Sequence, residues 1–312
     1  VSGWLALMGK VSIGGIQAFI QYMNQFTQPI TQTANIASVF QSTAAAAERI
    51  FEFLEEEEEK PETNNTPKIK NVRGRVEFNK INFGYFPDRP IIKDFTAQIK
   101  PKSRVAIVGP TGAGKTTIVN LLMRFYDIDS GEILIDGTNI EKMKRSDVRS
   151  LFGMVLQDTW LFNDTIAENI AFGKSGATRE EIIEAAQEAQ IDHLIRTMPN
   201  GYDTIISDSI DSISVGEKQL LTIARAILAD APMLILDEAT SSVDTRTEIL
   251  IQTAMEKLTK NRTSFVIAHR LSTIKNADLI LVMQNGNIVE QGQHQELLDK
   301  KGFYYSLYNS QF

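Results

Sequence analysis

The sequence contains a glycine-rich stretch whose residue types and spacing could bind phosphate, Gly109-Pro110-Thr111-Gly112-Ala113-Gly114-Lys115-Thr116-Thr117. It fits the pattern G-x-x-x-x-G-K-[ST], in which backbone N–H groups surround the phosphates of a nucleotide. The glycines permit left-handed backbone torsions and let the loop approach a phosphate without a Cβ in the way. Lys115 would place a positive charge on the β- and γ-phosphates, and the Thr116 hydroxyl would be a ligand of Mg²⁺. The stretch therefore predicts a nucleotide-binding site.

The residues on either side of this stretch predict the elements that position it. Residues 104–108 are apolar and mostly β-branched, as in a buried strand. A helix is expected over 116–125, because apolar residues recur there at helical spacing: Ile118, Leu121, Leu122 and Phe125. A strand, a glycine loop and a helix in that order direct a helix N-terminus at an anion. This context favours a phosphate loop over the alternative, a chance glycine turn before a structural helix.

A second apolar run ends in two carboxylates that could complete the site. Residues 233–236 are followed by Asp237 and Glu238, and ligands of open α/β sheets bind at the carboxyl ends of the strands. Asp237 would bind Mg²⁺ through its water shell, and Glu238 would be the general base for an attacking water. We expect Asp237 and Lys115 to lie on neighbouring strands. The alternative is that the two carboxylates are only a solvated strand end.

The remaining apolar runs predict an α/β fold with a helical insertion. Strands are expected over 72–83, 95–99, 131–137, 152–156, 264–269, 279–283 and 287–290. The last two are joined through Asn285-Gly286, which is typical of a two-residue hairpin turn. Helical patterns over 179–190 and 217–229 indicate that residues 158–230 form a mainly helical insertion between strands.

Length and composition bound the class of protein. The 312 residues suggest about two domains, and the hydrophobic fraction of 43% and charged fraction of 23% are ordinary for a folded chain. The net charge of −7 argues against a nucleic-acid partner bound through a basic face. The absence of cysteine excludes disulfides and thiolate metal sites and suits a protein that faces the cytosol. We find no pattern of a cleavable signal peptide.

The N-terminal part has a different character. Lys10 is the only charged residue among the first 47, and a helix is expected from about Ser12 through Leu54. Its amides align on one face: Gln17, Gln21, Gln25, Gln28 and Gln32. Such a stripe suits a membrane helix with one face on a polar cavity; a long soluble amphipathic helix is the alternative, and Pro29 would kink either one. The glutamate run 55–59 and the prolines after it predict a solvated linker over 55–70.

The segment Ile213-Ser214-Val215-Gly216-Glu217-Lys218-Gln219 resembles the signature motif of ATP-binding cassette (ABC) proteins, usually L-S-G-G-Q. Other marks of the family occur in the family's order. Tyr85 stands where an aromatic residue stacks on adenine, Gln157 matches the Q-loop, and residues 241–244, ending in Asp244, match the D-loop. His269 matches the switch histidine that contacts the γ-phosphate, although a lone histidine is more often structural. The resemblance covers residues 71–312.

The resemblance implies the fold, the activity and the partners. It implies a P-loop ATPase domain with a mixed sheet, an antiparallel β-subdomain and a helical subdomain. It assigns ATP binding to Tyr85, residues 109–117, residues 214–217 and Asp244. Mg²⁺ would be held by Thr116, Gln157 and Asp237, and Glu238, His269 and Gln157 would act in catalysis. Each ATP would lie between Lys115 of one subunit and the signature residues of a second ABC half-transporter, identical or different, so neither subunit is active alone.

The N-terminal residues 1–54 resemble the last membrane helix and cytoplasmic extension of a type IV exporter half-transporter. Such half-transporters have about six membrane helices, so this sequence is expected to be a fragment of a longer protein. The resemblance implies a location in the cell membrane, with the ATPase domain on the cytoplasmic side in contact with intracellular loops. It also implies that ATP hydrolysis powers export of a substrate that the sequence does not identify.

Two departures from the family pattern and two other functions bear on this interpretation. Ile213, Val215 and Glu217 replace the commonest signature residues, and residues 207–212 replace a stretch rich in Glu and Gly, which affects the expected loop contacts. A soluble ABC ATPase of DNA repair or translation would lack the charge-poor N-terminal helix. A regulatory module that binds ATP without turnover often lacks the carboxylate found here at Glu238.

Overall fold

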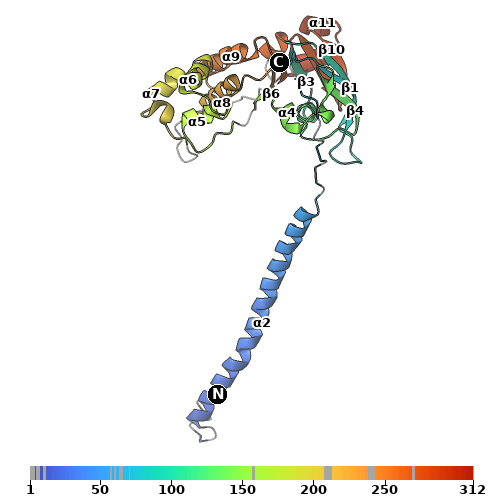
Figure 1. The fold of residues 1–312 in the computed structure, drawn as a ribbon. Coiled ribbons are helices and arrows are strands. Elements are labelled where there is room, and N and C mark those ends of the chain that lie inside the picture. The colour runs from blue at the N-terminus through green and yellow to red at the C-terminus, as the bar shows by residue number, and fades with distance from the viewer. Residues whose placement is uncertain are drawn as a thin grey trace. The chain divides into compact units, whose positions relative to one another are not determined.

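The computed structural model describes residues 4, 8–9, 12–56, 58–59, 61–62, 66–69, 71–156, 159–206, 213–237, 243–268 and 271–311. The chain divides into two compact units, Val1–Pro61 and Glu62–Phe312. Figure 1 shows the helices and strands of each unit.

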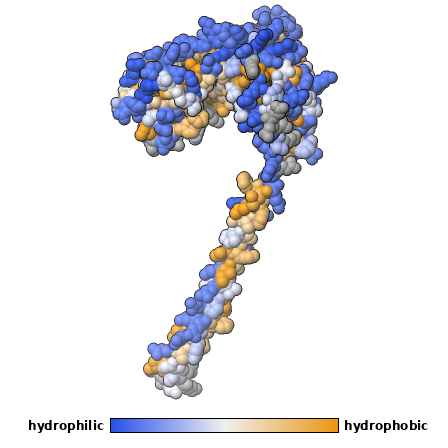
Figure 2. All heavy atoms as spheres, in the orientation of Figure 1, coloured by the Kyte–Doolittle hydropathy of each residue, from blue (hydrophilic) through white to orange (hydrophobic). Residues whose placement is uncertain are grey.

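The first unit consists mainly of one helix, α2 (Ile13–Leu54), which is 42 residues long. It begins at the N-cap Ser12, whose side chain accepts a hydrogen bond from the Gly15 N–H. Helix α2 runs through Pro29 without interruption, and the Thr33 hydroxyl donates to the Pro29 carbonyl at 2.8 Å. No residue of α2 is buried in this chain. Figure 2 shows polar and apolar side chains both reaching the surface along the helix.

The long N-terminal helix expected from the sequence is thus present. Within the part of the chain that the structure describes, however, no helix combines the length and the apolar character needed to cross a membrane.

The second unit contains two sheets among its described residues. The four-stranded antiparallel sheet has the order β2-β1-β4-β5, and its strands are β1 (Val76–Phe83), β2 (Ile92–Ile99), β4 (Ser130–Ile135) and β5 (Thr138–Asn139). The six-stranded sheet has the order β10-β9-β3-β8-β7-β6. Its strands are β3 (Arg104–Val108), β6 (Phe152–Val155), β7 (Met233–Asp237), β8 (Thr263–Ile267), β9 (Leu279–Gln284) and β10 (Asn287–Gly292). Only β10, joined to β9 through Asn285-Gly286, pairs antiparallel to its neighbour in this sheet.

The helices of the second unit connect the strands or cover the sheets. They are α3 (Lys115–Leu122), α4 (Arg145–Arg149), α5 (Ile166–Ala171), α6 (Arg179–Glu188), α7 (Asp192–Thr197), α8 (Val215–Ala229), α9 (Thr245–Thr259), α10 (Leu271–Lys275), α11 (His294–Asp299) and α12 (Phe303–Gln311), with short 3₁₀ helices at Ile140–Lys142 and Gly201–Asp203. Figure 1 shows α5, α6, α7 and α8 grouped on the side of β6, away from β1 and β4. This group lies within the predicted helical insertion.

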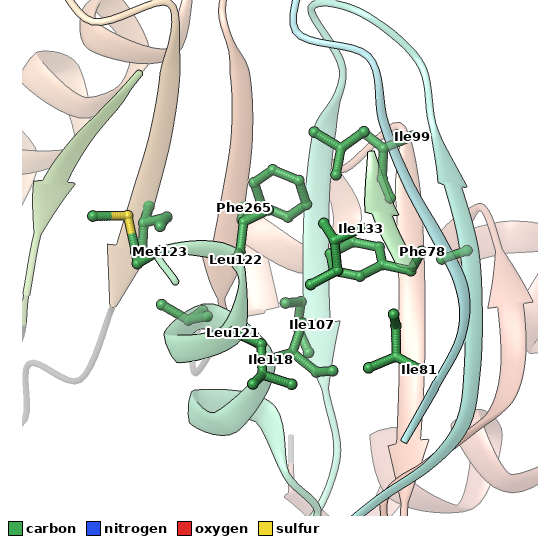
Figure 3. Close-up of a cluster of buried hydrophobic side chains, with 14 of the residues drawn as sticks. Phe78, Ile81, Ile99, Ile107, Ile118, Leu121, Leu122, Met123, Ile133 and Phe265 are labelled. Atoms are coloured by element: carbon green, nitrogen blue, oxygen red, sulfur yellow. The ribbon is translucent and has the colours of Figure 1, made fainter. Parts of the chain in front are cut away.

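The main core lies where α3 packs between the two sheets (Figure 3). Ile118 and Leu121 of α3 meet Ile107 of β3, while Phe78 and Ile133 enter from the antiparallel sheet. All five side chains are at most 1% exposed. The helix ends at Leu122, so the predicted extension to Phe125 is wrong, and the ring of Phe125 is exposed. Because side chains from both sheets pack against α3, the helix holds the C-terminal end of the loop that precedes it in place.

Candidate nucleotide-binding site

The phosphate loop joins the carboxyl end of β3 to the first turn of α3, as predicted. Strand β3 lies between β8 and β9, in parallel register with both. The loop turns through Gly109, Gly112 and Gly114, with φ angles of 154°, 79° and 99°. Gly114 is the N-cap of α3 and provides no side-chain cap, so the N–H groups of the first turn face the loop. The result is a helix N-terminus suited to an anion.

Glycine is required at the base of the loop by close packing against the β9–β10 hairpin. A Cβ at Gly109 would lie 2.3 Å from the Met283 carbonyl oxygen, and a Cβ at Gly286 would lie 1.8 Å from the Ile91 carbonyl oxygen. The Gly286 N–H also donates to the Ala113 carbonyl at 3.2 Å. The predicted hairpin is present, and its turn supports the phosphate loop directly.

Lys115 is held against its own loop. Its Nζ donates to the carbonyl oxygens of Gly109 and Pro110, at 2.7 and 3.0 Å. Burial lowers the pKa of the Lys115 ammonium from its ordinary value of 10.5, while the negative charge of Asp237 acts in the opposite direction. A partly desolvated ammonium at this position is strongly attracted to an anion, because the surrounding medium screens the charge less than water does.

Asp237 and the phosphate loop line one cavity of about 370 Å³. The lining residues are Ile91, Thr111, Gly112, Ala113, Gly114, Lys115, Thr116, Thr117, Asp237 and Ile267. The expectation that Lys115 and Asp237 lie on neighbouring strands is wrong, because β8 lies between β3 and β7. The three strands are parallel, so their carboxyl ends still meet at one edge of the sheet. The Thr116 hydroxyl and the Asp237 carboxylate thereby offer the cavity oxygen atoms of the kind that Mg²⁺ prefers.

Tyr85 lies beside α3, with 39% of the residue exposed. Its hydroxyl donates to the Thr117 hydroxyl at 3.5 Å and accepts from Asn120 Nδ2 at 3.3 Å. Thr117 belongs to the phosphate loop, so the predicted base-binding and phosphate-binding residues are directly linked. No sequence pattern distinguishes Asn120, because a polar residue on the exposed side of a helix is ordinary.

The signature segment begins helix α8. Ser214 is its N-cap: the Ser214 hydroxyl accepts from the Glu217 N–H at 3.3 Å, and the Glu217 carboxylate accepts from the Ser214 N–H at 2.7 Å. This reciprocal pair is a capping box. Ser214 and Val215 are exposed, whereas Gly216 is buried. The lining of the cavity described above includes none of Ile213–Glu217 among the described residues.

Gly216 packs the start of α8 against the start of α9, and Asp244 caps α9. A Cβ at Gly216 would lie 2.5 Å from Thr247 Cγ2 and 2.8 Å from Val243 Cγ1, so only glycine fits here without movement. Asp244 is the N-cap of α9 and accepts from the Arg246 and Thr247 N–H groups at 3.0 and 3.1 Å. Its pKa is lowered, first by the Thr247 side chain and then by these N–H groups. In this chain both residues have structural roles, and their predicted contacts with a nucleotide stay predictions.

Three predicted residues, Gln157, Glu238 and His269, lie outside the described residues. In the sequence each follows within two residues of the end of β6, β7 or β8. Their roles stay predictions.

Comparison with known proteins identifies the family. Residues 92–241 match the sequence model of the family described as ABC transporter. The chain belongs to the ABC transporter family. The matched range includes the phosphate loop, the capping box of α8 and Asp237, whereas Tyr85 and Asp244 lie outside it.

Relatives of this ABC transporter chain match it over nearly its whole length. It is 58% identical to a fatty acid ABC transporter ATP-binding/permease protein of Mycobacterium bovis, over 96% of this chain and 47% of the relative. It is 44% identical to an ATP-dependent lipid A-core flippase of Idiomarina loihiensis, over 100% of this chain and 54% of the relative. A solved structure of a bacterial Atm1-family ABC exporter with ATP bound matches 97% of this chain and 53% of its own, with 39% identity and a TM-score of 0.78. The chain thus spans about half the length of the curated relatives that it matches.

Proposed function

We propose that this chain is the ATP-binding and ATP-hydrolysing part of an ABC exporter. The observation that carries the proposal is the cavity in which the phosphate loop, Lys115 and Asp237 meet at the carboxyl edge of a parallel sheet. Its loop backbone turns through left-handed glycines, and Lys115 is partly desolvated, which together favour a polyanion. The relatives are named as transporters, and this favours transport over a role in DNA repair, translation or regulation alone.

In this proposal each residue of the site has a limited task. The N–H groups of residues 112–116 would receive the phosphate oxygens, and Lys115 would leave its carbonyl partners to neutralise the β- and γ-phosphates. The Tyr85 ring would stack on the base. Thr116 and Asp237 would hold Mg²⁺, with Gln157, and the ion would supply charge neutralisation at the phosphates. Glu238, the residue after Asp237 in the sequence, would position and activate the attacking water, and His269 would contact the γ-phosphate.

We further propose that this chain acts as a dimer with a second ABC half-transporter. The partner would be either a copy of the same chain or a different chain. Ser214 and Val215 are exposed and lie outside the lining of the chain's own cavity. A second ABC half-transporter would bring its signature residues to the nucleotide held by the first. ATP in this shared interface would close the dimer, and hydrolysis would reopen it.

The remaining parts of the assembly are proposals on the same basis. Residues 1–54 would be the end of a membrane domain, residues 55–70 its linker, and residues 71–312 the ATPase domain, with a helical subdomain at about 158–230. The longer protein would lie in the cell membrane with this domain on the cytoplasmic side, in contact with its intracellular loops. Its substrate would be exported across that membrane.

The purified chain tests the enzymatic part. ATP hydrolysis per molecule should rise with protein concentration, because the active species is a dimer. Lys115→Ala should abolish ATP binding, and Glu238→Gln should bind ATP, accumulate as a dimer in light scattering and turn over very slowly. A hydrolysis rate per molecule that stays constant on dilution would contradict the shared site. Unchanged ATP affinity of Lys115→Ala would contradict the phosphate-loop assignment.

A further inference from the structure

The side chain of Tyr85 is fixed to helix α3 by its hydroxyl group. The hydroxyl contacts two residues one turn apart on α3, donating to Thr117 Oγ1 at 3.5 Å and accepting from Asn120 Nδ2 at 3.3 Å. Thr117 lies 32 residues after Tyr85 in the sequence, and Asn120 lies 35 residues after it. Helix α3 is the helix whose first turn carries Lys115 and Thr116.

The ring of Tyr85 is also enclosed from two sides. The rings of Phe83 and Tyr126 meet it edge-on, with centroids 5.0 and 4.9 Å away and interplanar angles of 83° and 81°. Phe83 is only 4% exposed, so its ring is held in place by the surrounding core, whereas Tyr126 is 47% exposed. Two ring contacts and two hydroxyl contacts leave the aromatic side chain little rotational freedom, although much of it remains exposed.

We propose that Asn120 is a positioning residue for the nucleotide base, acting through the Tyr85 hydroxyl. The inference rests on the proposed function, in which the Tyr85 ring stacks on the base. A ring that is already oriented costs less conformational entropy to bind than one that must be ordered by the ligand. Asn120 supplies this orientation from the same helix that holds the phosphates, so base and phosphate sites keep a fixed relation.

The proposal separates two kinds of ligand. Loss of the Asn120 contact should weaken ATP, which has a base, and should leave inorganic tripolyphosphate unaffected, because the phosphate loop is unchanged. One neutral hydrogen bond predicts a loss of about three- to tenfold in ATP affinity. The readout is therefore the ratio of the two affinities, measured by isothermal titration with Mg²⁺ present.

The experiment is a double-mutant cycle on the purified chain. Asn120→Ala removes the donor, Tyr85→Phe removes the hydroxyl and keeps the ring, and the double variant removes both. Asn120→Asp keeps the size of the side chain and can accept a hydrogen bond from the Tyr85 hydroxyl. Its ratio of ATP affinity to tripolyphosphate affinity should be close to that of the wild type, since the added negative charge weakens both ligands alike. Asn309→Ala, at an exposed asparagine of α12, is the matched control and should behave as the wild type.

The expected result is a selective loss of ATP affinity in Asn120→Ala that disappears in the Tyr85→Phe background. An equal loss for tripolyphosphate would overturn the proposal, since Asn120 would then act on the phosphate loop. A full loss that persists without the Tyr85 hydroxyl, or no loss at all, would also overturn it. Lys115→Ala reports on the proposed function separately: it should lose both ligands, and its failure to do so would overturn the nucleotide site itself.

Discussion

The carboxylate of Glu217 accepts a hydrogen bond from the backbone N–H of Ser214 at 2.7 Å, at the N-terminus of α8. The Ser214 hydroxyl accepts from the Glu217 N–H in return. The pair occupies two donors that otherwise have no partner at the start of the helix. It also places a negative charge where the proposed function brings a phosphate from the partner's nucleotide.

Glu217→Gln should therefore change stability and binding in opposite directions. The amide oxygen can still accept from the Ser214 N–H, but the favourable charge at the helix N-terminus is lost, so unfolding free energy should fall by about 0.3–1 kcal/mol. ATP-dependent dimerisation should become stronger, because a like charge near the phosphate is removed. Light scattering at low and high salt checks this, since the gain should shrink as salt rises. A fall in stability without any change in dimerisation would place Glu217 away from the nucleotide.

Gly216→Ala should destabilise the contact between α8 and α9. The added methyl group would lie within 3 Å of Thr247 Cγ2 and Val243 Cγ1, and overpacking of this kind costs about 1–3 kcal/mol. Urea unfolding measures the loss. Thr247→Ser removes Cγ2 and keeps the hydroxyl, so the double variant should recover part of the stability. If the changes in unfolding free energy of the two single variants simply add in the double variant, the added methyl group is accommodated by residues other than Thr247.

The sequence predicted the parts of the site that are local in the chain. The phosphate loop follows from glycine spacing between an apolar strand and a helix, and Asp237 follows from an apolar run that ends in a carboxylate. Strand order does not follow from such runs, which is why the placement of Lys115 and Asp237 on neighbouring strands was wrong. Crossover connections insert β8 between their strands.

Contacts between segments far apart in the sequence could not be predicted from it either. Asn120 meets Tyr85 across 35 residues, and Gly286 of the predicted hairpin donates to the Ala113 carbonyl, a contact that the hairpin pattern does not predict. The packing of Gly216 against Thr247 depends on how α8 and α9 meet. None of these residues has a local pattern that distinguishes it from others of its type, because the constraint comes from the tertiary contact.

Lys115 should make stability and ATP binding depend on pH at alkaline values. Its pKa in the folded chain is lowered by burial below the ordinary 10.5 that applies on unfolding. Between these two values the unfolded chain binds more protons, so the Lys115 contribution to the unfolding free energy rises with pH. Compared with Lys115→Ala, the wild type should therefore gain relative stability in urea unfolding from pH 7.5 to pH 10. ATP affinity of the wild type should fall over the same interval, because the ammonium is lost. A stability difference between wild type and Lys115→Ala that does not change with pH would contradict the lowered pKa.

Arg225→Lys should destabilise the helical subdomain although it keeps the positive charge. The Arg225 guanidinium donates to the Asn169 carbonyl at 2.9 Å, to Asn169 Oδ1 at 3.2 Å and to the Trp160 carbonyl at 3.3 Å. It also lies over the rings of Phe162 and Phe172, at 5.7 and 5.3 Å from their centroids.

An ammonium cannot match these acceptors and both rings at once, because it lacks the planar fork of arginine. Asn169 Oδ1 keeps the Phe162 N–H as a donor, but the Asn169 and Trp160 carbonyl oxygens lose the Arg225 donor, which should cost about 1–3 kcal/mol of unfolding free energy. Thermal and urea unfolding measure the loss, and tripolyphosphate binding at the distant phosphate loop serves as the control that the rest of the fold is intact. Wild-type stability of Arg225→Lys would show that charge alone, without the planar geometry, holds the segment from Trp160 to Phe172 on α8.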